Sequence, residues 1–162
     1  MSSAHHQNLT DLEIVSCTPV HADVLAGLHG ACFEKPWDTP SFKTFLEMPG
    51  GFGFVARLHE QPVGFILAQI AQDEGEIISL GVLSNHRRRG FAEALVKAAE
   101  SHLVKCEGQA MFLEVAESNL AAKSLYEALG YRTVGRREGY YKLQEGPVDA
   151  LVLKRVVAAG SF

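Results

Sequence analysis

The sequence has no long hydrophobic run, few cysteines and little net charge. No apolar stretch of the 162-residue chain approaches the roughly 18 residues that a membrane helix needs, so we expect no membrane partner. Its three cysteines, Cys17, Cys32 and Cys106, are far apart and lack metal-ligand spacing, which predicts reduced thiols and a cytoplasmic location. A net charge of -4 argues against a nucleic-acid partner, because binding to the phosphate backbone needs a broad basic surface.

The common signatures of nucleotide and metal sites are missing as well. The chain has no GxxxxGK[ST] phosphate loop, and Gly50, Gly51 and Gly53 neither follow a predicted strand nor open a predicted helix. Its seven histidines show no HExxH or comparable ligand spacing, so no metal site is predicted. Residues 1–10 lack the apolar core of a signal peptide and are expected to form a polar N-terminal tail.

Hydrophobic periodicity predicts a single domain over residues 11–157, followed by a short C-terminal tail at 158–162. Strand patterns occur at 12–17, 52–58, 63–71, 75–83, 111–116, 131–135 and 149–156. Helical patterns occur at 24–32, 40–46, 91–105 and 121–129. The resulting order, β-α-α-β-β-β-α-β-α-β-β, predicts an α/β protein of the α+β kind, in which the three strands between 52 and 83 form a meander.

What the sequence does have is a basic turn, Arg87-Arg88-Arg89-Gly90-Phe91-Ala92, between a predicted strand and the predicted helix 91–105. Free amides at a helix start carry about half a unit of positive charge and point outward, where an anion can meet them. Gly90 lets a ligand approach the backbone without a side chain in the way. The turn therefore predicts a site for a phosphorylated cofactor, and the alternative is a solvated basic turn that opens a surface helix.

The turn also carries a family resemblance. Arg87-x-x-Gly90-x-Ala92 after a hydrophobic strand resembles the acetyl-CoA signature [QR]-x-x-G-x-[GA] of the GNAT family of N-acetyltransferases. Other motifs, over roughly residues 12–155, resemble the family or its RimI-type subgroup, which acetylates the N-terminal alanine of a small-subunit ribosomal protein. They are Cys32-Phe33, Pro36-Trp37, Leu113-Glu114-Val115, Ser118-Asn119, Ala121-Ala122, Leu125-Tyr126, Leu129-Gly130-Tyr131, Gly135-Arg136-Arg137, Tyr140-Tyr141 and Asp149-Ala150.

The resemblance implies a GNAT fold with a central, mixed, mostly antiparallel and splayed β-sheet flanked by helices. It also implies acetyl-CoA as the cofactor, with its pantetheine arm on strand backbone and its pyrophosphate on the turn amides. The implied cofactor-binding residues are Leu80, Gly81, Val82, Arg87, Arg88, Arg89, Gly90, Phe91, Ala92 and Asn119. Gly81 fits independently, because a glycine inside a strand often marks a bulge or a close backbone approach; the alternative is a packing glycine. Asn119 can also cap the helix that follows it.

Acetyl transfer to an amine needs a neutral nucleophile, a stabilised oxyanion and a proton for the leaving thiolate. Glu114 interrupts the apolar run 111–115, and burial in a covered strand would make its carboxyl a stronger general base. The alternative is the exposed face of an edge strand. The resemblance places the proton donor at Tyr126 and the oxyanion donor at the Val82 amide, although the neighbours of Tyr126 alone favour a core aromatic.

On the peptide side, Trp37, Tyr140 and Tyr141 are predicted loop aromatics that could wall a groove, although large aromatics more often simply pack. The resemblance implies transfer of the acetyl group directly to the N-terminal α-amino group of a protein, as in the RimI-type subgroup. No cysteine is among the residues that the resemblance places at the reaction, so no acyl-enzyme intermediate is expected. Two alternatives stay open: a lysine or small-molecule amine acetyltransferase of the same fold, and a non-catalytic acyl-CoA-binding module.

Overall fold

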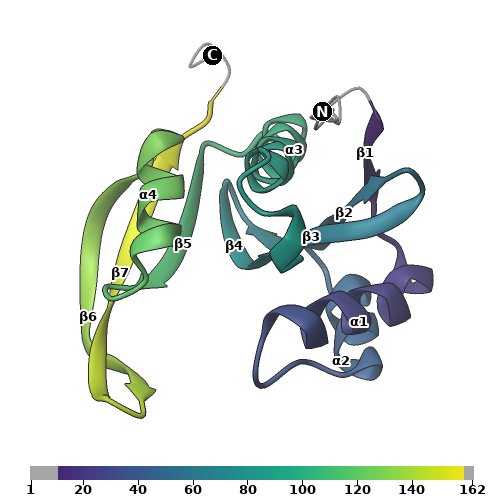
Figure 1. Cartoon of the computed structure of the whole chain (residues 1–162). Coiled ribbons are helices and arrows are strands. Elements are labelled where there is room, and N and C mark those ends of the chain that lie inside the picture. Colours follow the sequence, from purple (N-terminus) through teal and green to yellow (C-terminus); the bar gives the residue numbers. More distant parts are fainter. Residues whose placement is uncertain (1–10, 159–162) are drawn as a thin grey trace, which may run out of the picture.

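In the computed structural model, which describes residues 11–158, seven strands form one sheet with helices on both faces (Figure 1). The strands are β1 (Leu12–Ser16), β2 (Gly51–Leu58), β3 (Gln61–Ala71), β4 (Glu74–Val82), β5 (Ala110–Ala116), β6 (Arg132–Leu143) and β7 (Gly146–Val156). The helices are α1 (Ala22–Cys32), α2 (Thr39–Glu47), α3 (Phe91–Lys105) and α4 (Leu120–Ala128). The elements follow the predicted order. Of the two predicted tails, 1–10 and 158–162, only residue 158 is among the described residues. Within residues 11–158, no helix is long and apolar enough to cross a membrane.

Antiparallel neighbours make up most of the sheet, whose strand order is β1-β2-β3-β4-β5-β7-β6. The strands β2, β3 and β4 follow one another as the predicted meander. One pair differs: β4 and β5 run parallel, and α3 forms the crossover between them. The mixed, mostly antiparallel sheet that the family resemblance implied is thus confirmed.

The parallel pair β4 and β5 holds together only at its start. Their Cα partners end at Ile77 opposite Leu113, and beyond this point the two strands separate. Figure 1 shows the resulting splay, with β5, β7 and β6 turned away from β1 to β4. Just after the last pair, β4 carries an extra residue, Ile78, in its register with β3. This β-bulge lies at Ile78 and not at Gly81, where the sequence analysis allowed for one.

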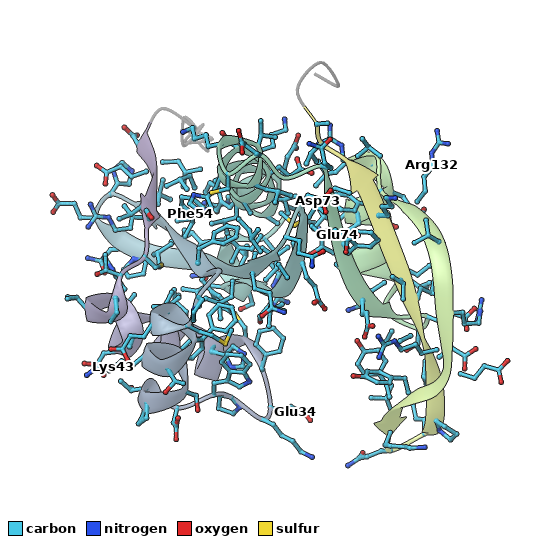
Figure 2. The ribbon with its side chains drawn as sticks, turned by 180° about the vertical axis from the view of Figure 1, so that it is seen from behind. Glu34, Lys43, Phe54, Asp73, Glu74 and Arg132 are labelled. Carbon is cyan, nitrogen blue, oxygen red and sulfur yellow. The ribbon has the colours of Figure 1, made fainter. Side chains whose placement is uncertain are left out.

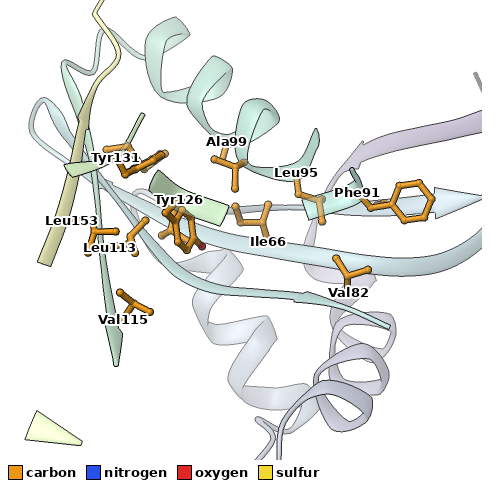
Figure 3. Close-up of a cluster of buried hydrophobic side chains, with 14 of the residues drawn as sticks. Ile66, Val82, Phe91, Leu95, Ala99, Leu113, Val115, Tyr126, Tyr131 and Leu153 are labelled. Carbon is orange, nitrogen blue, oxygen red and sulfur yellow. The ribbon is translucent and has the colours of Figure 1, made fainter. Parts of the chain in front are cut away.

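Two hydrophobic cores sandwich the sheet. The core under α3 and α4 contains Leu95 of α3 and Leu113 of β5 (Figure 3). On the opposite face, the core of α1 and α2 contains Phe42 and Phe65. The strand β3 supplies both cores, because successive side chains of a strand point to opposite faces: Ile66 joins the first core and Phe65 the second. A strand buried on both faces explains its continuous apolar run.

Strand β6 is longer than predicted and includes Tyr140 and Tyr141, which the sequence analysis places in a loop. Between Arg137 and Tyr141 the register with β7 shifts, so that three residues of β6 bulge opposite Asp149. The Asp149 carboxylate closes the bulge by accepting a hydrogen bond from the Gly139 amide at 2.8 Å. Because most side chains of β6 are exposed, this strand has no alternating pattern from which its length could be predicted.

A buried polar network connects the two halves of the splayed sheet. The side chain of Glu100 on α3 is 5% exposed, and its carboxylate pairs with the Arg155 guanidinium of β7 at 2.8 Å. The Tyr131 hydroxyl donates to the same carboxylate at 2.8 Å. Burial and the nearby carboxylate raise the pKa of Tyr131, so the phenol remains a donor. Since α3 packs on β2, β3 and β4, this network joins that half to β7 and to the residue preceding β6.

Replacing Tyr131→Phe should lower the free energy of unfolding by about 1–3 kcal/mol, because the buried Glu100 carboxylate loses a hydrogen-bond donor. Urea unfolding measures the change. The control is Lys97→Ala, which removes the exposed ion pair with Glu93 on the same helix and should cost less than about 0.5 kcal/mol. Equal effects of the two variants would contradict a special role for the buried network.

Candidate functional site

A cleft of about 850 Å³ opens where β4 and β5 separate, a volume in the range of small-molecule sites. It brings most of the predicted site residues together. Those that line it are Leu80, Gly81, Val82, Arg87, Arg88, Gly90, Phe91, Ala92, Glu114, Asn119, Tyr126 and Tyr141. Among the described residues, the predicted members that lie outside its lining are Arg89, Trp37 and Tyr140.

The open edge of β4 forms one wall of the cleft. The Leu83 amide donates to the Val63 carbonyl of β3 at 2.8 Å, and backbone groups in an antiparallel ladder alternate in direction from residue to residue. The N–H and C=O groups of Val82 therefore point away from β3, toward the side that β5 has left. Leu80, two residues earlier, lies on the same edge. These backbone groups can hydrogen-bond to an extended ligand.

Gly81 lies between these two residues because of tight packing. A Cβ atom at Gly81 would come within 2.7 Å of the Phe65 ring and 3.1 Å of the Cys32 sulfur. Such distances leave no room for a side chain. The packing alternative for Gly81 is therefore confirmed, although its backbone still lines the cleft.

The start of α3 forms another part of the cleft wall. Gly90 occupies the N-cap position with φ of +84°, and no side chain caps the helix. Arg88 also has a positive φ, +62°, so the chain turns sharply before the helix. The first amides of α3 lack a side-chain acceptor and present their partial positive charge to the cleft. An anion such as a diphosphate fits this position.

The three arginines of the turn are placed differently. Arg88 lines the cleft beside the helix start. Arg87 also lines it, but its Nε atom donates to the Val82 carbonyl at 3.0 Å. Arg89 lies outside the lining. The sequence motif alone could not distinguish these positions, because all three residues have the same chemistry.

The strand β5 is an interior strand of the sheet, but Glu114 lies one residue beyond its last pair with β4 and is paired there with β7 alone. Its side chain is 18% exposed and lines the cleft. Its Oε1 atom is 2.9 Å from the Nε atom of Arg137 on β6, so the two side chains form an ion pair. The sequence analysis considered only the apolar residues around Glu114 and missed this cation, which reaches it from a strand beyond β7.

Tyr126 of α4 is a core aromatic that also lines the cleft. Its ring is 5% exposed within the core under α3 and α4 and makes an edge contact with Tyr131, with centroids 5.4 Å apart (Figure 3). It also lines the cleft. Burial raises the pKa of this phenol, so the hydroxyl keeps its proton at neutral pH.

Asn119 and the tyrosines of β6 border the cleft as well. Asn119 caps α4 as predicted, with its Oδ1 atom accepting from the Ala122 amide at 3.2 Å. Tyr141 lines the cleft, whereas Tyr140 is half exposed outside it. The guanidinium of Arg137 lies 5.3 Å from the Tyr140 ring centroid. Tyr140 thus contacts the cation that pairs with Glu114.

Trp37 lies in the predicted loop between α1 and α2, but its ring packs against Phe42 and Phe45. Its amide donates to the Nδ1 atom of buried His29 at 3.0 Å. Burial lowers the pKa of His29, which keeps the ring neutral and able to accept this bond. The packing alternative therefore describes Trp37. The sequence analysis also missed Cys32 and Phe33 as lining residues, although it quoted both as a family motif.

An ion-pair network fixes the bulge of β6 beside the cleft. The Arg136 guanidinium is 2.7 Å from both Glu117, just after β5, and Asp149 of β7. Hydrogen bonding to Arg136 lowers the pKa of Glu117. Bonds from the Gly139 amide and then from Arg136 lower the pKa of Asp149. The network thereby connects β6, β7 and the residue that follows β5.

The donors of the cleft fit acetyl-CoA. The open edge of β4 at residues 80–82 would hold the amide-containing arm, and the amides of residues 88–92 would hold the diphosphate. Carboxylate and phenol groups face the same space. When bound, acetyl-CoA supplies the acetyl group as a thioester.

Gly90→Ala should weaken the binding of coenzyme A, measured by titration calorimetry, because a Cβ in the left-handed region costs about 1–2 kcal/mol and displaces the turn. Gly146→Ala is the matched control: this glycine also has a positive φ and open space around it, but lies at the β6–β7 turn. Both variants should lower the free energy of unfolding. Equal affinity of Gly90→Ala and the parent chain would contradict the assignment of the turn.

The network around Asp149 should add pH-dependent stability. Because the folded pKa of Asp149 is lowered, its contribution is present above the unfolded pKa, near 4, and is lost as the pH falls through the folded value. Asp149→Ala should therefore destabilise the protein at pH 7, with a gap to the parent that closes toward pH 2–3 in urea unfolding. Asp149→Asn keeps an acceptor for Gly139 and should destabilise less. A gap of constant size at all pH values would contradict the ion-pair assignment.

Sequence and structure comparisons agree with this geometry. A model of the acetyltransferase (GNAT) family matches residues 23–131. The [ribosomal protein bS18]-alanine N-acetyltransferase of Escherichia coli K12 is 31% identical over 120 residues, which cover 73% of this chain and 79% of that protein. The N-alpha-acetyltransferase RimI of Mycobacterium tuberculosis is 27% identical over 151 residues, 91% of this chain and 89% of that protein.

Solved structures share the fold. The crystal structure of the E. coli ribosomal-protein-S18-alanine N-acetyltransferase matches with a TM-score of 0.84 and 24% identity, over 93% of this chain and 97% of that chain. Arabidopsis thaliana NAA60 in complex with a bisubstrate analogue matches with a TM-score of 0.77 and 20% identity, over 93% and 99% of the two chains. The chain therefore belongs to the GNAT family of acetyltransferases and is an acetyl-CoA-dependent N-acetyltransferase.

Proposed function

We propose that this enzyme acetylates the N-terminal α-amino group of a protein, by direct attack in a ternary complex, and that its substrate is the N-terminal alanine of a small-subunit ribosomal protein. The names of the E. coli and M. tuberculosis relatives support the N-terminal substrate, and that of the E. coli relative supports the ribosomal protein. Bacterial ribosomal proteins are made in the cytoplasm, which is the location proposed for this chain.

One observation carries the proposal: the cleft has a carboxylate and a phenol on opposite sides of the open edge of β4. Leu113 and Val115 point into the core that contains Tyr126, so Glu114 between them points to the other face of the sheet. Both Glu114 and Tyr126 nevertheless line one cleft. A group that accepts a proton and a group that holds one thus flank the same space.

Glu114 acts as the general base in this proposal. An α-amino group with a pKa near 8 is about one-tenth neutral at pH 7, whereas a lysine near 10.4 is neutral in fewer than about one molecule in a thousand. A carboxylate that takes the proton through a water molecule is sufficient help for the α-amine. Arg137 holds Oε1 of the carboxylate, which leaves Oε2 for this task.

Tyr126 acts as the general acid. Its buried hydroxyl keeps its proton at neutral pH and can give it to the leaving thiolate through a hydrogen bond. The Val82 amide, on the open edge of β4, donates to the acetyl oxygen as negative charge develops there. No acyl-enzyme is involved in this scheme.

Glu114→Gln and Tyr126→Phe should each lower kcat about 10²- to 10⁴-fold, the usual contribution of a general base or acid. The controls make the same chemical changes outside the cleft. They are Glu127→Gln, at an exposed position of α4, and Tyr131→Phe, at the ring that packs against Tyr126 in the core. Steady-state turnover with a peptide that begins with alanine measures all four. Unchanged turnover of both site variants would exclude this mechanism.

A peptide panel tests the substrate. Acetyl transfer from acetyl-CoA should be fastest to a peptide with a free N-terminal alanine, and slower to peptides that begin with methionine or glutamate. A peptide with a blocked N-terminus and an internal lysine, and a polyamine, should react at least tenfold more slowly at pH 7, because their amines are less often neutral. Preference for lysine or the polyamine would support the amine-acetyltransferase alternative, and no turnover on any amine would support the binding module.

A further inference from the structure

Arg87 begins the acetyl-CoA signature, and the family resemblance implies that it binds the cofactor. In the structure its side chain turns back toward the strand that precedes it. The Nε atom donates to the Val82 carbonyl at 3.0 Å, across a short 3-10 turn at Ser84–His86. The guanidinium is therefore anchored at the carboxyl end of β4, beside the open edge.

This contact changes what the edge of β4 offers a ligand. Beyond Ile77 the strand has lost β5, so Val82 presents both its N–H donor and its C=O acceptor toward the cleft. Arg87 occupies the acceptor. At this point the edge therefore presents a donor beside a fixed positive charge, which suits an oxygen on which negative charge develops.

The Cys32 thiol, at the end of α1, lies on the same side of the cleft. It packs next to Gly81 and lines the cleft together with Arg87. Burial raises the pKa of this thiol, and the nearby guanidinium opposes that rise. The last residue of α1, the last residue of β4 and Arg87 thus all line the cleft.

We propose that Arg87 is a positioning residue that holds the backbone at Val82, through the Val82 carbonyl, at the reacting end of the cleft, and that the phosphates are met by the turn amides and Arg88. This inference rests on the proposed function, because it assigns the Val82 amide to the acetyl oxygen. Two adjacent arginines of one motif thus have different roles: Arg87 orients the backbone, and Arg88 binds an anion.

The expected loss of kcat on removal of Arg87 follows from its indirect role. Removal of a direct oxyanion donor typically costs about 10² to 10³ in kcat. Because Arg87 acts through the backbone at Val82, its removal should cost less, about tenfold in kcat. Coenzyme A affinity should stay within about twofold of the parent value, because the diphosphate site is intact.

The test compares Arg87→Ala with Arg88→Ala and uses two acetyl donors, acetyl-CoA and S-acetylpantetheine, which has the same thioester but no phosphate. Arg87→Ala should lower turnover with both donors by the same factor. Arg88→Ala should raise the KM for acetyl-CoA and should reduce use of S-acetylpantetheine much less. Calorimetric titration with coenzyme A gives each variant's Kd without turnover, and thermal unfolding reports whether each variant folds. Arg87→Lys keeps the charge without Nε and serves if the alanine variant is unfolded.

The outcomes separate the possibilities. A loss confined to acetyl-CoA, with a weaker Kd for coenzyme A in Arg87→Ala, would make Arg87 a phosphate ligand and overturn the proposal. Unchanged turnover with both donors would also overturn it. A parent chain that binds coenzyme A but acetylates no amine would refute the proposed function instead, and the Kd comparison would still distinguish phosphate binding by Arg87 from phosphate binding by Arg88.

Discussion

The site depends on one structural constraint, the early end of pairing between β4 and β5. A parallel pair normally satisfies its backbone groups along its whole length, but here the partners stop at Ile77 and Leu113. The separation leaves donors and acceptors of β4 open and creates the cleft. It also exposes Glu114, which a continuous pairing of β5 with β4 would have covered. The groups proposed for cofactor binding and for chemistry therefore meet at the same break in the sheet.

A split sheet has to be held together elsewhere. At the closed end, the Glu100 carboxylate connects α3 to the half of the sheet that carries β7, as its contacts with Tyr131 and Arg155 show. At the open end, Arg136 and Asp149 fix the bulge of β6, and Arg137, just before that bulge, reaches Glu114. Figure 2 shows the splayed halves from behind, with α1 and α2 beneath one half and the β6–β7 hairpin forming the other side. The polar contacts thus stabilise the shape that the hydrophobic cores alone leave open.

Local patterns in the sequence were enough to predict the order of elements, the meander and the turn that begins α3 at Gly90. Gly90, Asn119 and the periodic apolar residues act within a few positions of themselves, so their roles could be predicted from neighbours. The misses are long-range. Tyr140 lies on a strand because Asp149 closes a bulge from another strand, and Arg137 meets Glu114 only after β7 has paired with both β5 and β6. Residue type at one position does not encode such contacts.

The central claim is that the open edge of β4 and the start of α3 hold the acetyl donor. Amide hydrogen exchange with and without saturating coenzyme A tests it most directly. Exchange at Val82 and Phe91 should slow when coenzyme A binds, while the Phe54 amide, within the regular pairing of β2 with β1 and β3, should change little. Unchanged exchange at both Val82 and Phe91 in the saturated protein, with protection appearing on other elements, would contradict the account.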